Sequence, residues 1–397
     1  MKVSDRWLNV EYAFVQGFYW MGFCVCMSFA AVFLQGRGYS NSSLGLIIAL
    51  GNVLGFVLAP SLASVVDRGR GVTVFRCVWV LLALQLLLLL CFTRIRAVSL
   101  GFSALYCLYI AFNAVVNTMN TQMSFDLGGW SGRINYSAAR GCGSLAYAPT
   151  ALLIGGFVQR HGSDVLPYIG ILFLLLQAVM LALVSAQSKR GADLRREAAA
   201  DKGDALSLVA FIRGNRRFCL LLLGMGFIFF SHNLVTNFLI NVVRNVGGDT
   251  TTMGGLNGFS ALMEIPVMLL YALVARRFRC ASLLRFSVVA FVAKSICTAL
   301  ASSVGWLFAA HLLQGLSFAL LTPASVQYTS LVVGPKDSTK GQALSYGMST
   351  LGSAFAGGFG GMLYDSIPVR GVLLIGAAVS AMGAVICEMG IDSRKSL

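Results

Sequence analysis

The chain has 397 residues, of which 57% are hydrophobic and only 11% are charged, and it carries a formal net charge of +15. Soluble domains contain about a quarter charged and about half apolar residues, so this composition excludes an ordinary soluble domain. With a mean hydropathy of +0.78, the sequence predicts an all-α protein that crosses a membrane several times. A cleaved signal peptide is not expected, because Asp5, Arg6 and Glu11 interrupt the N-terminal segment and the following apolar run is long enough to span a bilayer.

Apolar segments of about 20 residues recur along the chain, and this is the helix length that crosses a hydrocarbon core of about 30 Å. Backbone groups in lipid must be hydrogen-bonded internally, so each segment is expected to be a helix. Segments that exceed one span are expected to tilt or protrude. Twelve spans are predicted, at approximately 8–35, 42–66, 72–93, 97–122, 136–160, 165–186, 217–245, 252–275, 282–301, 303–333, 339–364 and 369–389.

Basic residues are concentrated in alternate loops. With both termini in the cytoplasm, 22 Lys and Arg residues fall on the cytoplasmic side, and the opposite side holds only Arg37, Arg94, Arg96, Arg160, Arg244 and Arg370. The positive-inside rule therefore predicts cytoplasmic termini, and we expect a bacterial-type cytoplasmic (inner) membrane. Topology accounts for the net charge, so no nucleic-acid partner is expected.

A long polar connection, residues 188–204, separates the sixth predicted span from the seventh. It divides the chain into a six-helix bundle at 1–187, a cytoplasmic linker at 188–212 and a second six-helix bundle at 213–397. Basic segments ending in Arg follow the second and the eighth span, which indicates a weak internal repeat. Two related six-helix halves are typical of secondary transporters with a mid-membrane site.

The ten cysteines are scattered, mostly inside apolar segments, and no pair of CxxC motifs exists. They are expected to be small apolar side chains within helices rather than disulfides or metal ligands, and no cofactor is expected. The chain contains no GxxxxGK[ST] loop and no HExxH motif, which argues against ATP-driven pumping. Its compact loops offer no catalytic or sensory domain, so an enzyme is not expected.

The segment Ala63-Ser-Val-Val-Asp67-Arg68-Gly-Arg70 resembles the signature between helices 2 and 3 of the major facilitator superfamily. It departs from that signature in having Ala63 in place of glycine and in being one residue short before Arg70. The resemblance implies twelve helices in two pseudo-symmetric bundles. It also implies that Asp67 and Arg68 act as a gate at the cytoplasmic end.

A closer resemblance is to the lactose-permease-like branch, which includes proton symporters for oligosaccharides, nucleosides and phenylpropionate. Ser-Ala-Ala-Arg140-Gly-Cys-Gly-Ser-Leu-Ala-Tyr147 is similar to the fifth-helix motif of that branch, which implies a substrate-binding arginine at Arg140 and a stacking aromatic at Tyr147. The branch pairs this arginine with a fourth-helix carboxylate. Asn120 and Gln122 stand near that register here and are expected to bind substrate, with Asp126 a turn further on. A headgroup-facing arginine is the alternative.

The same branch has an eighth-helix acid, a ninth-helix arginine and a tenth-helix His-x-x-Glu. These resemble Glu264, Lys294 and the pair His311 and Gln314, with Gln in place of Glu. The resemblance also extends to Met362-Leu-Tyr-Asp-Ser-Ile at the end of the eleventh span.

Ionisable groups within spans are rare and mark transport pathways by default. Lys294 needs a partner because an unpaired buried cation destabilises the fold. Since Gln314 replaces the tenth-helix acid, Glu264 is the remaining carboxylate, and we expect it to be coupled to Lys294. His311 and Gln314 share one helix face and are expected to lie beside them. All four are predicted to bind substrate, and Glu264, Lys294 and His311 to couple protons. A purely structural ion pair and a packing histidine are the alternatives.

Other polar and aromatic residues are expected to complete the lining. The substrate-binding candidates are Tyr19, Trp20, Asn233 and Asn237, with Tyr12, Gln16, Asn52, Asn117 and His232 as further lining residues. The glycines of residues 341–361 are expected to serve close helix packing.

The sequence therefore predicts a functional monomer that imports a small polar solute together with protons by alternating access. The solute is expected to be a sugar, an oligosaccharide or a nucleoside, and the other partners are H⁺ and the lipid bilayer. An organic-anion transporter for aromatic or sugar acids is the alternative, because the two cations Arg140 and Lys294 face one acid. A drug or metabolite exporter is a further alternative, against which the Arg140 motif argues.

Overall fold

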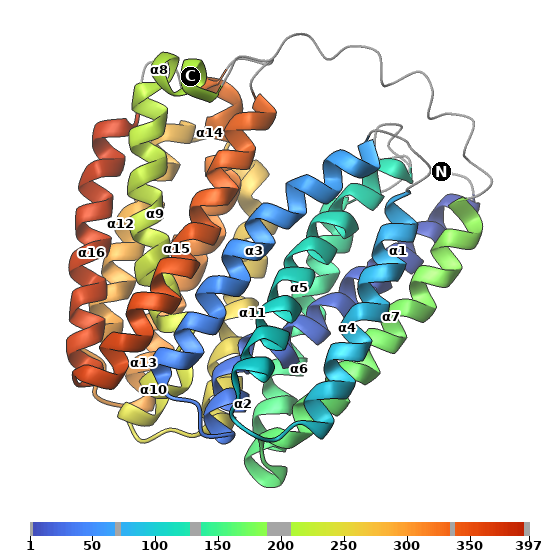
Figure 1. The fold of residues 1–397 in the computed structure, drawn as a ribbon. Coiled ribbons are helices and arrows are strands. Elements are labelled where there is room, and N and C mark those ends of the chain that lie inside the picture. Colours follow the sequence, from blue (N-terminus) through green and yellow to red (C-terminus); the bar gives the residue numbers. More distant parts are fainter. Residues whose placement is uncertain (1–2, 68–72, 128–135, 189–207, 334–337, 393–397) are drawn as a thin grey trace. The chain divides into compact units, whose positions relative to one another are not determined.

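The computed structural model describes residues 3–67, 73–127, 136–188, 208–333 and 338–392, and these residues form helices joined by turns, without a strand (Figure 1). They contain ten helices long and apolar enough to cross a membrane, or eleven if the bent pair Trp7–Ser28 and Ala30–Gly36 is one span. The 29-residue helix α15 (Ser338–Ser366) falls in the remaining predicted span. Its many Gly, Ser and Thr residues lower its hydropathy. The all-α polytopic fold is confirmed.

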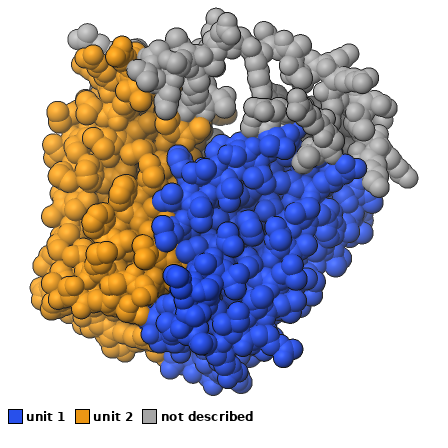
Figure 2. All heavy atoms as spheres, in the orientation of Figure 1, with its two compact units in different colours: residues 1–39, 50–201 blue, residues 40–49, 202–397 orange. Residues whose placement is uncertain are grey.

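The chain divides into two compact units (Figure 2). Unit 1 comprises residues 1–39 and 50–201, and unit 2 comprises residues 40–49 and 202–397. Within the predicted linker at 188–212, residues 189–207 lie outside the described residues, and a short helix begins at Leu208.

Unit 1 contains the helices of the first six predicted spans. The first span is broken by a π-helical turn, η1, and a short 3-10 turn, η3, precedes the last helix. The elements are α1 (Val3–Phe23), η1 (Cys24–Ser28), α2 (Ala30–Gly36), α3 (Asn41–Asp67), α4 (Val74–Arg94), α5 (Leu100–Asp126), α6 (Tyr136–His161), η3 (Ser163–Val165) and α7 (Leu166–Ser188).

Arg37, directly after α2, organises one end of unit 1. Its guanidinium lies over the rings of Phe33 and Phe102, with Cζ 4.3 Å and 4.9 Å from the ring centroids. It also donates to the carbonyl oxygen of Phe92 at 2.6 Å and contacts the Asp164 carboxylate at 3.4 Å. Burial lowers the pKa of Arg37, and the charge of Asp164 partly offsets this effect. One cation thus joins α2, α4, α5 and η3.

Unit 2 contains the remaining helices, and its fourth predicted span, 303–333, is divided by a 3-10 turn, η5, and a π-helical turn, η6. The elements are α8 (Leu208–Gly214), α9 (Arg216–Thr236), α10 (Leu239–Asn245), α11 (Thr250–Val274), α12 (Cys280–Ala299), α13 (Val304–His311), η5 (Leu312–Gln314), η6 (Gly315–Ala319), α14 (Leu320–Val332), α15 and α16 (Val369–Gly390).

Local sequence signals set several helix ends. Asp249 caps α11 by accepting a hydrogen bond from the Thr252 backbone N–H at 2.8 Å, and Ser303 caps α13 in the same way, which satisfies otherwise unpaired donors of the first turn. Gly247 follows α10 with φ +82°, a left-handed conformation that favours glycine.

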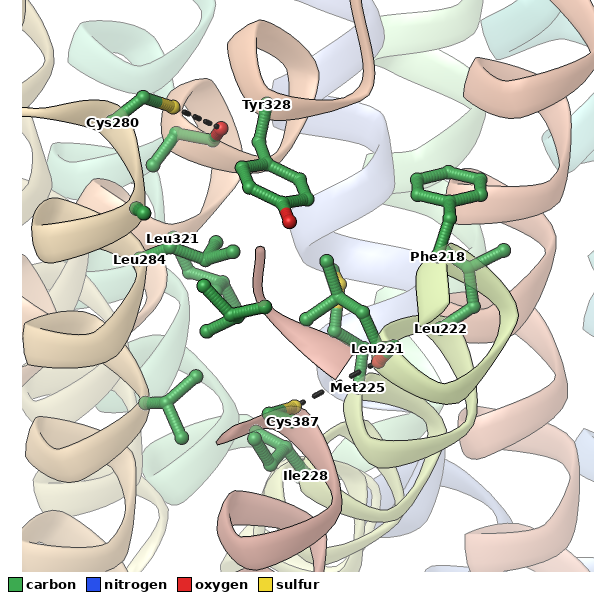
Figure 3. Packing of buried hydrophobic residues seen from close by; sticks show 14 of the residues in the cluster. Phe218, Leu221, Leu222, Met225, Ile228, Cys280, Leu284, Leu321, Tyr328 and Cys387 are labelled. Carbon is green, nitrogen blue, oxygen red and sulfur yellow. Dashed lines mark hydrogen bonds between the residues drawn. The ribbon is translucent and has the colours of Figure 1, made fainter. Parts of the chain in front are cut away.

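The hydrophobic core of unit 2 lies between α9, α12, α14 and α16 (Figure 3). Glycines bring α9 and α16 close together: a Cβ on Gly224 would lie 2.6 Å from the Cys387 backbone N, and one on Gly383 would lie 2.8 Å from the Gly224 carbonyl oxygen. The Cys387 thiol donates to the Leu221 carbonyl oxygen at 3.7 Å. All ten cysteines are free thiols in this structure.

The first residues of α3 belong to unit 2 because they pack against α15. The Asp365 carboxylate accepts hydrogen bonds from the backbone N–H groups of Asn41 (3.2 Å) and Ser42 (2.7 Å) and from both side chains. Although partial burial raises the pKa of Asp365, these hydrogen bonds lower it below its usual value. A Cβ on Gly357 would lie 2.7 Å from the Gly45 carbonyl oxygen, so the expected role of this glycine in close packing is confirmed.

We expect Gly383→Val to destabilise unit 2, because its side chain would collide with the Gly224 backbone and with Phe227. Overpacking of this kind costs about 1–3 kcal/mol, which would lower the thermal unfolding temperature of the detergent-solubilised protein. Gly305→Ala is the control, since nothing lies within 4 Å of a Cβ at that position. Equal unfolding temperatures for the two variants would contradict the packing argument.

Candidate functional site in two groups of side chains

Glu264 lies near the middle of α11 and is half-buried. Two residues further along the helix, Pro266 lacks a backbone N–H, which removes one hydrogen bond of the preceding turn. Gly315 then allows a close approach of η6, because a Cβ at this position would lie 2.7 Å from the Met263 carbonyl oxygen. Met263 directly precedes Glu264, so this close contact places the Glu264 carboxylate beside the irregular segment formed by η5 and η6.

Gln314 links Glu264 to Lys294. Its amide Nε2 donates to Glu264 Oε1 at 2.7 Å, and its Oε1 accepts a hydrogen bond from Lys294 Nζ. Lys294 on α12 and Gln314 are both buried, at 6% and 5% relative exposure. Glu264 and Lys294 are therefore linked through the Gln314 amide. Within the described residues, no carboxylate contacts the Lys294 ammonium directly.

Two histidines lie near this chain of contacts. The Nδ1 atom of His311, at the end of α13, is 2.8 Å from the Leu307 carbonyl oxygen, so Nδ1 carries the proton and Nε2 is left as an acceptor. His232 on α9 stacks on Phe318, with ring centroids 5.3 Å apart and an interplanar angle of 23°. Both histidines lie within electrostatic range of Lys294. His311 is where the sequence places it, beside Lys294 and Gln314.

The asparagines of α9 are held by backbone groups. Asn233 Nδ2 donates to the Phe229 carbonyl oxygen in its own helix at 2.7 Å. Asn237, at the end of α9, donates to the Ser353 carbonyl oxygen of α15 at 3.3 Å. Both side chains are half-buried, and no contact between them and the Gln314 chain is present in the described residues.

The second group of predicted site residues lies in unit 1, around Arg140 on α6. Its guanidinium lies over the ring of Trp20 of α1, with Cζ 3.8 Å from the ring centroid, and donates to Ser144 Oγ at 3.1 Å. A Cβ on Gly143 would lie 2.4 Å from Trp20 Cδ1, so this glycine makes room for the indole. The Tyr147 hydroxyl is 2.8 Å from Ser28 Oγ at the end of η1.

Of the remaining candidates in unit 1, Tyr19 and Asn120 are buried. The Tyr19 hydroxyl donates to Asn113 Oδ1 at 2.9 Å. Asn120 is fully buried, and within the described part of the chain neither its Oδ1 nor its Nδ2 has a hydrogen-bond partner. Gln122 is half-buried on α5. The predicted gate cannot be located: Asp67 ends α3, but its side chain and Arg68 lie outside the described residues.

Three features of the site were not predicted from the sequence. The π turn η1 contains Ser28, which contacts Tyr147, and the π turn η6 contains Phe318, which stacks on His232. Gly315 allows α11 to pack closely against η6. Gly315 directly follows Gln314, which is the available sequence signal for a close contact at that point. Nothing in the sequence marks Ser28. Among the described residues, no group of three His, Cys, Asp or Glu side chains could hold a metal ion.

The long apolar helices, with charged groups inside them, define a polytopic membrane protein. The chain matches the model of the MFS_1 like family over residues 10–372. It therefore belongs to this family, and its resemblance to the major facilitator superfamily is confirmed.

Solved structures show the same fold. The nucleoside transporter NupG matches with a TM-score of 0.74 and 14% identity over 96% of this chain and 98% of that one. A bacterial homolog of the human lysosomal transporter Spinster, in an inward-facing and unoccupied conformation, matches with a TM-score of 0.69 and 13% identity over 100% and 98%. Comparison with curated protein sequences gives no significant match.

We expect Lys294→Met to destabilise the protein, because it removes the donor to the buried Gln314 Oε1 and the positive charge that Gln314 links to Glu264. Breaking one side of a buried charge pair in direct contact costs roughly 3–5 kcal/mol. Because the Gln314 amide separates these two charges, we expect a smaller loss, which should appear as a lower thermal unfolding temperature in detergent. The double variant Lys294→Met/Glu264→Gln should recover most of this loss. A double variant as unstable as Lys294→Met would show that the two residues are not coupled.

Proposed function

We propose that this MFS transporter is a proton-coupled importer of a small polar solute, in the class of sugars, oligosaccharides and nucleosides, and that it works by alternating access. The observation that carries the proposal is the hydrogen-bonded chain Glu264–Gln314–Lys294 inside helices of unit 2 that are apolar enough to span a membrane. Ionisable groups at such positions are costly, and they typically face a pathway.

Proton coupling requires a group whose charge can change during the cycle, and Glu264 has the chemistry for it. An ionised carboxylate only accepts hydrogen bonds, whereas a protonated one can also donate. Binding or loss of one proton therefore changes both the charge of the Glu264–Gln314–Lys294 chain and the hydrogen bonds that it offers to a solute. Lys294 has three N–H donors, and Gln314 accepts a hydrogen bond from one of them, so the others can donate hydrogen bonds to the solute.

The class of solute is supported by the polar groups of each unit. Arg140 presents a planar set of donors suited to hydroxyl or carboxylate groups, and Trp20 covers one face of this set. Tyr147 adds an aromatic ring and a hydroxyl to the same end of unit 1. Nucleosides belong to the proposed class, and NupG is a nucleoside transporter. The similarity to NupG is one of fold.

The proposal includes the setting of the protein. A monomer in a bacterial-type cytoplasmic membrane, with both termini cytoplasmic, agrees with the strong bias of Lys and Arg between alternate loops. Asp67 and Arg68 at the end of the second span are proposed as the cytoplasmic gate on the resemblance of their segment to the superfamily signature.

The test is uptake into proteoliposomes that contain the purified protein, with an imposed pH gradient and three labelled probes: uridine, lactose and phenylpropionate. Wild-type protein should accumulate a neutral probe only when the gradient is present. Exclusive uptake of phenylpropionate would instead support an organic-anion transporter. Uptake of every transported probe without regard to the gradient would refute proton coupling.

Glu264→Gln should reduce gradient-driven accumulation to background, because the amide cannot bind and release a proton, while exchange of labelled for unlabelled solute persists. The control is Glu388→Gln, which removes an exposed carboxylate whose partner is Arg285 on the surface of unit 2. This control should accumulate solute as the wild type does. Undiminished accumulation by Glu264→Gln would remove Glu264 from the coupling step.

A further inference from the structure

The orientation of the Gln314 amide is set by its two hydrogen-bond partners, Lys294 and Glu264. An ammonium only donates hydrogen bonds and an ionised carboxylate only accepts them, so Oε1 must face Lys294 and Nε2 must face Glu264, as observed. The opposite orientation would place two donors against each other and two acceptors against each other. A neutral side chain with one donor end and one acceptor end is therefore suited to stand between this cation and this anion.

A direct contact between Lys294 and Glu264 would have a different effect. The attraction between two charges falls with their separation and is strong where the surroundings exclude water. An opposite charge in direct contact favours the ionised carboxylate and can shift its titration by about 1–3 pH units. By occupying the space between the two groups, the Gln314 amide lengthens their separation and weakens this effect, while it still accepts one hydrogen bond from the buried ammonium.

The helix around Gln314 fixes the amide in this place. Gln314 ends the 3-10 turn η5 and is followed by the π turn η6. The Ser317 hydroxyl donates to the Leu313 carbonyl oxygen at 2.7 Å, which satisfies a backbone group of the irregular segment. Gly315 packs against Met263, so the amide and the carboxylate are held in register from both sides.

We infer that Gln314 is a positioning residue for proton coupling: it bridges Lys294 and Glu264 and prevents their direct ion pair, so that the Glu264 carboxyl group can gain and lose a proton during transport. The inference rests on the proposed proton coupling and assigns the residue that makes it possible. Among the described residues of unit 2, the charged and titratable groups near this bridge include Glu264 from α11, Lys294 from α12, His311 from α13 and His232 from α9.

The test is an infrared titration of the purified protein that follows the carboxylic acid band of Glu264, identified by its absence in Glu264→Gln. Gln314→Ala removes the bridge and also empties the space that the amide occupies, so Lys294 can contact the carboxylate. We expect the midpoint of the band to move to lower pH by about one unit or more. The same substitution in a Lys294→Met background should leave the midpoint where Lys294→Met alone places it, which a merely structural role of Gln314 does not predict.

Gln314→Glu is a second variant, for which we expect the Glu264 titration midpoint to shift in the opposite direction. It places another carboxylate between Lys294 and Glu264, and a neighbouring like charge opposes ionisation, so the Glu264 midpoint should move to higher pH. Each variant is first checked for a single symmetric size-exclusion peak, and the variant that folds carries the test if the other does not. A wild-type midpoint in the folded variant, or a shift of the opposite sign, would overturn the inference.

These outcomes are separate from those of the uptake experiment. If wild-type uptake ignores the pH gradient, the proposed function fails whatever the titration shows. If wild-type uptake is coupled to protons and the Gln314 variants titrate as the wild type does, the function stands and only the role of Gln314 fails.

Discussion

The buried ammonium of Lys294 is the constraint on which the second unit depends. A cation removed from water is tolerated only where partners compensate for the lost hydration, and each partner has its own structural requirement. Gln314 reaches Lys294 from a helix that changes type on either side of it. Glu264 reaches Gln314 because Gly315 allows the backbone of α11 to approach. The irregular helix, the glycine and the carboxylate are thus consequences of placing one positive charge on α12.

The two units accommodate their mid-helix cations by different chemistry. Arg140 in unit 1 lies on the indole of Trp20 and donates to a serine hydroxyl, and a planar guanidinium suits both contacts. Lys294 in unit 2 is a compact charge whose contact is an amide oxygen, with a carboxylate behind it. The two residue types are therefore not interchangeable in their chemistry: a guanidinium offers a planar fork of donors, and an ammonium is a compact point charge.

The sequence alone was sufficient for the class of fold, and it singled out the three side chains that the structure links at Gln314. Long apolar segments have few structural alternatives in lipid, and rare ionisable residues within them are readily identified. The substitution of glutamine at position 314 led to the coupling of Glu264 with Lys294, and the glycines of α15 led to close packing. What could not be derived was where a helix changes type. Neither Cys24–Ser28 nor Gly315–Ala319 contains a proline, and Gly315 by itself predicts a close contact rather than a π turn.

The composition of α15 has a consequence for how the protein enters the bilayer. Its glycines permit backbone contacts with the start of α3 and with α9, but the residues that suit such contacts contribute little free energy of transfer into hydrocarbon. A segment of this kind is poorly retained by lipid on its own. Its stable insertion then relies on helices already present, with α9 and α14 as the neighbours that cover it, so membrane integration and tertiary assembly of unit 2 become a single cooperative step during biosynthesis.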